Sequence, residues 1–130
     1  MGGRWNSKGN RMVYTAEHYS LAVLEMLVNL DKSSILSSYS TSSVHFDDAL
    51  VESLDLSSLP ANWRKYPFPT ELPRLGDAWL AGMSSVILKV PSVITEIESN
   101  YLINPQHQDF ALLTIDSPRS FTFDLKRLHK

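Results

Sequence analysis

The chain has 130 residues, of which 43% are hydrophobic and 20% are charged, and its net charge is −2. This balance is typical of a globular protein and predicts a single domain over residues 1–130. The absence of cysteine excludes disulfides, thiolate catalysis and cysteine zinc sites and suits a cytoplasmic protein. Basic residues cluster only in the tail "LKRLHK", so we expect no direct nucleic-acid binding.

The first half of the chain predicts a turn, a short strand and a helix. The turn is expected at "SKGN" and the strand at "RMVYT". The helix is expected over residues 19–30, with Ser20 or Thr15 as its N-cap. It is apolar nearly all round and should therefore be buried. Glu25 interrupts its apolar run, which is too short to cross a membrane, and "MGGRWNSKG" has no signal-peptide core.

The middle of the chain is rich in serine, threonine and proline. Residues 33–43 are interpreted as a surface connection or a weak edge strand. Strands are expected at "VHF" and "ALVESL", on either side of an acidic turn. Prolines mark the loops that follow. A helix is expected next, with Leu72, Leu75 and Trp79 on one face and Gly82 as its end cap.

The second half favours β structure. In "SVILKV", residues 86, 88 and 90 should share one face of a strand that ends at Pro91. "DFALLTI" is apolar on both faces, as a central strand would be, and "FTFDL" alternates cleanly. One long helix followed by mainly β structure predicts an α+β fold.

Glu25 is the most informative single residue. Its helical neighbours at three and four positions are mostly apolar, and an unpaired buried carboxylate costs on the order of several kcal/mol. It therefore needs a partner, a proton or a function that justifies the cost. A salt bridge to Arg4 or Arg11 at a core edge is about as probable as a functional role.

Two residues near the start could contact a ligand. Arg4 lies between glycine and Trp5, where a guanidinium could approach a phosphate or carboxylate, although an isolated surface arginine is the commoner case. Tyr14 ends a predicted strand and could place its ring on a ligand, although most such tyrosines pack in the core.

A second polar region, "VPSVITEIESNYLINPQH", follows a predicted strand. Ser92 would lie at the mouth of that strand, followed by Asn100, Asn104 and His107. Turn chemistry is the alternative for these residues and is strong for Asn104, which precedes a proline. The sequence has no histidine spacing typical of metal ligands, no glycine-rich phosphate loop and no GxSxG motif.

In order along the chain, "GGRWNSKGNRMVYTAEHYSLAVLEMLV", "LPANWRKYPFP", "LGDAWL", "LKVPSVI", "NYLINPQH" and "FTFDLKRL" resemble the RES domain family of bacterial toxin–antitoxin systems. The resemblance implies a compact fold like that of ADP-ribosyltransferases, with a mixed β core, a cleft for NAD and no metal. It implies that NAD is a substrate, consumed by hydrolysis, by phosphorolysis or by transfer of ADP-ribose to a protein. A catalytically weak NAD-binding or protein-interaction domain is the alternative.

The resemblance also implies residue roles and partners. It gives Glu25, Ser92 and Tyr14 as catalytic, and its NAD-binding residues are Gly3, Arg4, Trp5, Tyr14, Ser92 and Asn104. The implied partner is an Xre-like helix-turn-helix antitoxin in the cytoplasm, and a homo-oligomer is possible. Family members carry a strand with another arginine before the "GGRWN" block, and this segment is expected to be missing here, since Met1 directly precedes Gly2.

Overall fold

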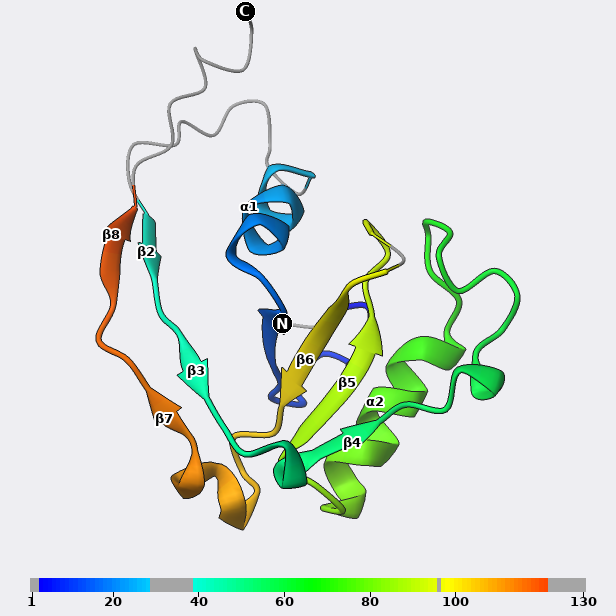
Figure 1. Cartoon of the computed structure of the whole chain (residues 1–130). Helices are drawn as coiled ribbons and strands as arrows, with labels where there is room; N and C mark the ends of the chain where they lie inside the picture. The colour runs from blue at the N-terminus through cyan, green and yellow to red at the C-terminus, as the bar shows by residue number, and fades with distance from the viewer. Residues whose placement is uncertain (1–2, 29–38, 96, 122–130) are drawn as a thin grey trace, which may run out of the picture.

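The computed structural model describes residues 3–28, 39–95 and 97–121 (Figure 1). Its helices are α1 (Tyr19–Val28) and α2 (Glu71–Gly82). Short 3-10 turns cover Asp48–Leu50, Leu56–Ser58 and Gln108–Leu112. The strands are β1 (Val13–Ala16), β2 (Tyr39–Thr41), β3 (Val44–His45), β4 (Val51–Ser53), β5 (Ile87–Pro91), β6 (Ser99–Ile103), β7 (Thr114–Ile115) and β8 (Arg119–Phe121).

A four-stranded mixed sheet forms the centre of the molecule, in the order β1-β6-β5-β4. β4 and β5 are parallel, whereas β1 and β5 both pair antiparallel with β6. The register places Asn100 of β6 opposite Ala16 of β1 and Val90 of β5. The mixed sheet and the two helices confirm the predicted α+β class.

Both faces of the sheet are covered, because alternate residues of a strand point to opposite sides. On one face, Leu88, Val90 and Leu102 pack with α2 and with Trp5. On the other, Ile87 and Ile103 pack against residues around β3 and the 3-10 turn at Gln108–Leu112. Figure 1 shows α2 along one side of the sheet and the β2–β8 and β3–β7 pairs forming an arm on the other.

Helix α1 differs from its prediction. Among its described side chains, Leu21 is buried, whereas Tyr19 is 57% and Leu24 is 43% exposed. The helix follows β1 and lies at an end of the sheet rather than under a sheet face, so described residues cover only part of its surface (Figure 1). Neither predicted residue is the N-cap of the helix: Ser20 is inside it, and Thr15 lies in β1, where its hydroxyl donates to the Tyr101 carbonyl.

The predicted strands at "VHF" and "SVILKV" are confirmed as β3 and β5, and "ALVESL" contains β4, although residues 49 and 50 belong to the preceding 3-10 turn. The predicted α2 stripe is also confirmed, since Leu72 and Trp79 are buried. However, Gly82 is still helical, and the left-handed residue that ends α2 is Met83, at φ 55°. Val86 packs with Ile87 rather than with Leu88 and Val90.

"DFALLTI" is not a central strand, and this prediction was wrong. The segment contributes most of a 3-10 turn and the two-residue β7, and Leu112 is 63% exposed. In the serine-rich segment, residues 39–41 form β2, a short strand that pairs with β8. The short strand β3 follows it and pairs with β7. Only the first residue of "FTFDL" belongs to β8. Residues 33–38 of the serine-rich segment and residues 122–125 of "FTFDL" lie outside the described residues.

No helix within residues 3–28, 39–95 and 97–121 is both long and apolar enough to cross a membrane.

Candidate functional site

The carboxylate of Glu25 is held at one end of the central sheet. The Asn100 side chain donates from Nδ2 to Glu25 Oε1 at 2.9 Å. The Ser92 hydroxyl donates to Glu25 Oε2 at 3.3 Å and accepts from the backbone N–H groups of Ile94 and Thr95. Ser92 is fully buried, while Glu25 is half-buried.

The topology explains why these three residues meet. β5 and β6 are antiparallel, so Ser92, just after β5, lies beside the first residues of β6. β1 ends opposite Asn100, and α1 begins three residues later. Glu25, in the second turn of α1, is thereby brought onto this end of the sheet.

Opposing influences set the acidity of Glu25. Burial raises the pKa of its carboxyl, because a charged form is poorly solvated there. Hydrogen bonds from Asn100 and Ser92 act in the opposite direction, and the nearby Glu98 carboxylate raises the pKa further. The net result is a pKa above the ordinary value of 4.5. A carboxyl with a raised pKa and a polar clamp is typical of functional sites.

Arg4 lies on a tight turn closed by backbone hydrogen bonds between Gly3 and Asn6. Its Nη1 donates to the carbonyls of Trp63 at 2.9 Å and Lys65 at 3.3 Å. The guanidinium also lies over the Phe68 ring, 5.2 Å from its centroid. Partial burial lowers the pKa of Arg4, which the neighbouring tyrosines 14 and 66 partly oppose. Arg4 thus contacts carbonyls rather than forming the salt bridge considered for Glu25.

Tyr14 fixes the same turn from β1. Its hydroxyl accepts from the Trp5 N–H at 3.0 Å and donates to Asn6 Oδ1 at 2.5 Å. Burial raises the pKa of Tyr14, and the hydrogen bond from Trp5 partly offsets this. The residue is 43% exposed, so part of its ring remains accessible. Gly3 is close to it, because a Cβ there would approach the Tyr14 hydroxyl to 2.8 Å.

Two further residues that were predicted to bind NAD, Trp5 and Asn104, make contacts typical of a structural role. Trp5 is a core residue, 3% exposed, and packs beneath α2. Asn104 lies after β6, at the opposite end of that strand from Asn100. Its Nδ2 donates to the Leu80 carbonyl and its Oδ1 accepts from the Gln106 N–H, which is turn chemistry. The structure therefore places Asn104 at the end of β6 away from Glu25 and Ser92.

Asn100 is the contact that sequence reasoning did not assign to the site. The polar density of the segment around it was the available signal, and the proline after Asn104 favoured turn chemistry for Asn104 rather than for Asn100. Its assignment to Glu25 depends on the pairing of β1 with β6, which only the structure shows.

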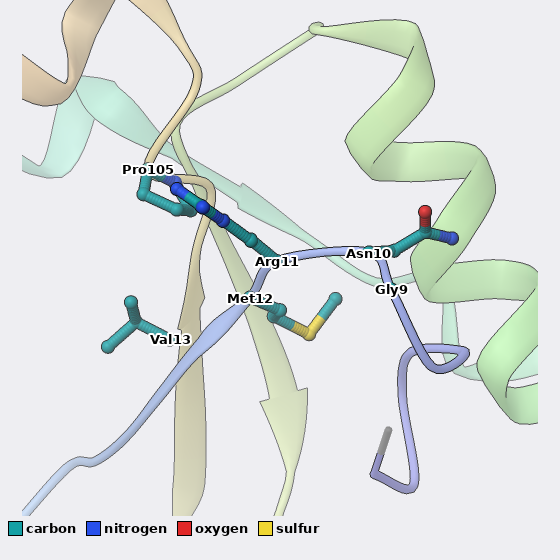
Figure 2. Close-up of a pocket in the computed structure, with 6 residues that line it drawn as sticks. All are labelled: Gly9, Asn10, Arg11, Met12, Val13 and Pro105. Carbon is teal, nitrogen blue, oxygen red and sulfur yellow. The ribbon is translucent and has the colours of Figure 1, made fainter. Parts of the chain in front are cut away.

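A surface hollow of about 450 Å³ lies at the other end of the β1–β6 pair (Figure 2). It is lined by residues 9–13 and by Pro105, and Figure 2 shows the Arg11 side chain extending toward Pro105. This hollow does not include Glu25, so it is separate from the carboxylate site. The described residues contain no group of three histidine, aspartate or glutamate side chains able to hold a metal.

Comparison with known proteins gives a consistent family assignment. The model of the RES domain matches residues 1–124. The chain is 40% identical over 124 residues to Toxin Res of Yersinia enterocolitica, covering 95% of this chain and 82% of that protein. It is 35% identical to Toxin Res of Photorhabdus laumondii, covering 84% and 70%. It is also 30% identical to the Prs ADP-ribosylating toxin of a Sphingobium species, covering 99% and 82%. The similarity to these bacterial toxins spans most of each chain, and the protein belongs to the RES domain family.

Proposed function

We propose that this protein is a toxin that cleaves the bond between nicotinamide and ribose in NAD. The observation that carries the proposal is the half-buried Glu25 carboxylate, clamped by Asn100 and Ser92 at the sheet end. The similarity to a protein named as an ADP-ribosylating toxin supports the choice of NAD as substrate, because such transfer uses NAD. The acceptor of ADP-ribose is water, phosphate or a protein side chain.

The chemistry needs a fixed negative charge. When the bond breaks, its electron pair leaves with the nicotinamide nitrogen, and positive charge develops on the ribose ring. A preorganised carboxylate beside that ring stabilises the charge. The acceptor oxygen then forms the new bond to the ribose carbon and gives up its proton. Glu25 in its ionised form would supply the charge, and Ser92 would keep the carboxylate oriented.

The other residues fit around this centre. Arg4 would hold the diphosphate, because a guanidinium binds phosphate oxygens with two parallel donors. Gly3 and Trp5 would support Arg4 by fixing its turn. The accessible part of the Tyr14 ring would contact the nicotinamide. Asn104, at the far end of β6, has no part in this proposal.

The toxin names of the relatives support a partner that restrains the activity. We propose a cytoplasmic antitoxin of the Xre-like helix-turn-helix type, a segment of which covers the NAD site. A saturated complex should then release no nicotinamide from NAD, and continued release at the free enzyme's rate would contradict this arrangement.

The experiment is nicotinamide release from NAD by the purified protein, by Glu25→Gln and by Glu71→Gln. Glu25→Gln keeps the shape of the side chain and should lower kcat by about 100-fold or more. Glu71, exposed at the start of α2, is the matched control and should leave the rate unchanged. A wild-type rate in Glu25→Gln would overturn the proposal. Dependence of the rate on added phosphate would separate phosphorolysis from hydrolysis.

A further inference from the structure

Arg64 lies beside the Glu25 site, although its position in the sequence gave no reason to expect this. Its Nη2 donates to the carbonyl of Val93 at 3.1 Å. Val93 directly follows Ser92, whose hydroxyl donates to Glu25. The guanidinium of Arg64 is therefore tied to the same turn that positions the proposed catalytic carboxylate.

Arg4, in the N-terminal turn, contacts the chain segment that contains Arg64. Its Nη1 donates to the carbonyls of Trp63 and Lys65, the residues on either side of Arg64. The segment 63–65 thus lies between the N-terminal turn and the turn after β5. It brings two guanidinium groups to one border of the site.

Among the residues that the structure describes, Arg4 has no acidic partner. Within residues 3–28, 39–95 and 97–121, Arg4 forms no ion pair, and its partners are neutral carbonyls and the Phe68 ring. A guanidinium has five N–H donors, and these contacts occupy only part of them. Two arginine side chains that meet at one short segment, Arg64 from within it and Arg4 from the N-terminal turn, are suited to a ligand that carries two adjacent negative groups.

We infer that Arg64 binds the diphosphate of NAD together with Arg4, and that it makes the enzyme select the dinucleotide over the phosphate-free nucleoside. This inference rests on the proposed cleavage of NAD. The nicotinamide ribose carries the breaking bond at one carbon and the diphosphate at the opposite side of the ring. With Glu25 beside the ribose, a diphosphate that extends toward the turn at Val93 would come within reach of the Arg64 guanidinium.

A purely structural role is the competing interpretation, since the Arg64 hydrogen bond also braces the turn that holds Ser92. The two interpretations differ in their substrate dependence. A loosened turn would disturb Glu25 and slow every substrate, whereas a lost phosphate contact would affect only substrates that contain phosphate.

The experiment measures kcat and KM for NAD and for nicotinamide riboside with wild type, Arg64→Gln and Arg74→Gln. For Arg64→Gln we expect kcat/KM for NAD to fall by about 10- to 100-fold, mainly through KM, with the riboside unaffected. Arg74, an exposed arginine on α2, is the matched control and should change neither substrate. Equal losses on both substrates, or no loss on NAD, would overturn the inference.

Binding of ADP, measured by calorimetry, gives a second readout that does not need turnover. The Kd for ADP should rise by a similar factor in Arg64→Gln and stay unchanged in Arg74→Gln. A wild-type protein that binds ADP through Arg64 without cleaving NAD would contradict the proposed function but support the diphosphate site. A Kd that Arg64→Gln leaves unchanged would contradict the diphosphate site itself.

Discussion

Asn100 controls both the position and the acidity of Glu25. Its amide carries two N–H groups, and Nδ2 donates to Glu25 Oε1 at 2.9 Å and to the Thr15 carbonyl at 3.2 Å. One side chain thus links the carboxylate of α1 to the backbone of β1. Because the amide donates to the carboxylate, it favours the ionised form and lowers the pKa that burial raises.

Replacing Asn100 with alanine should shift the acidic limb of NAD cleavage to higher pH. The reaction needs ionised Glu25, so the rate falls as the pH drops through its pKa. Without the amide donor the pKa rises further, and the fall begins at a higher pH. The pH dependence of nicotinamide release measures this, with Asn62→Ala, at an exposed loop position, as control. An acidic limb that stays in place, or moves to lower pH, would show that Asn100 does not tune Glu25.

At this scale the sequence pointed to Glu25 and, through the family resemblance, to Ser92, but it did not assign Asn100 to the site. Glu25 stands out because an acid in an apolar helix requires an explanation, and the pattern of one helix is enough to see it. Asn100 comes from a strand 75 residues later in the chain and reaches Glu25 through the register that sets Asn100 opposite Ala16. The salt bridge to Arg4 was a reasonable expectation by charge, but Arg4 instead donates to the carbonyls of Trp63 and Lys65.

At the scale of elements, hydrophobic patterns predicted a helix or strand correctly where one face of the element is buried. They failed where a local hydrogen bond from a polar side chain determines the backbone conformation. α2 was predictable because its apolar stripe repeats at helical spacing. β6, one of the two strands paired on both sides, begins with Ser99 and Asn100 and does not look like a central strand. "DFALLTI" does, yet the His107 ring accepts from the Asp109 N–H and caps a 3-10 turn there. The capping histidine lies just before this segment, so the apolar pattern of the segment itself does not reveal the turn.

Helix α2 and the N-terminal turn pack so closely that only glycine fits at position 76. A Cβ on Gly76 would lie 1.5 Å from the Trp5 carbonyl oxygen, which is backbone and cannot move aside cheaply. We expect Gly76→Ala to lower the free energy of unfolding by about 1–3 kcal/mol or more. Urea denaturation monitored by tryptophan fluorescence gives the value.

Gly82 in the same helix provides the matched control. A Cβ there meets no atom within 4 Å, so Gly82→Ala should be neutral or should raise stability by about 0.4–1 kcal/mol. If both alanine variants were equally stable, the close packing of α2 on Trp5 would not exist in solution. Because the same turn carries Arg4, Gly76→Ala should also weaken NAD binding more than Gly82→Ala does.

At the scale of the whole molecule, the carboxylates of Asp77 and Glu25 make the free energy of unfolding depend on pH in opposite directions. Burial alone would raise the pKa of Asp77, but hydrogen bonds from Ser7 and Asn10 outweigh it and lower the pKa below 3.8. One of these is the Ser7 N–H, which donates to Oδ1 at 2.9 Å and docks the N-terminal loop on α2. Glu25, at the opposite end of β1, has a raised pKa.

The signs follow from proton linkage, because stability rises with pH where the unfolded chain binds more protons. Asp77 is protonated more readily in the unfolded chain, so its contribution is present above pH 3.8 and is lost as the pH falls through its folded pKa. Glu25 is protonated more readily in the folded protein, so its contribution is present below pH 4.5 and is lost as the pH rises through its folded pKa. Asp77→Asn should therefore lessen the destabilisation of the protein by acid.

Glu25→Gln should instead remove a decline in stability between pH 4.5 and the folded pKa of Glu25. Urea denaturation of wild type, Asp77→Asn and Glu25→Gln, at pH values below and above the pKa values of the two carboxylates, tests both predicted pH dependences together. A wild-type pH slope in Glu25→Gln would mean that Glu25 is not buried in solution, which would remove the physical basis of its proposed role. If Glu25 instead made the free energy of unfolding increase with pH, a cation such as Arg4 or Arg11 would pair with it in solution.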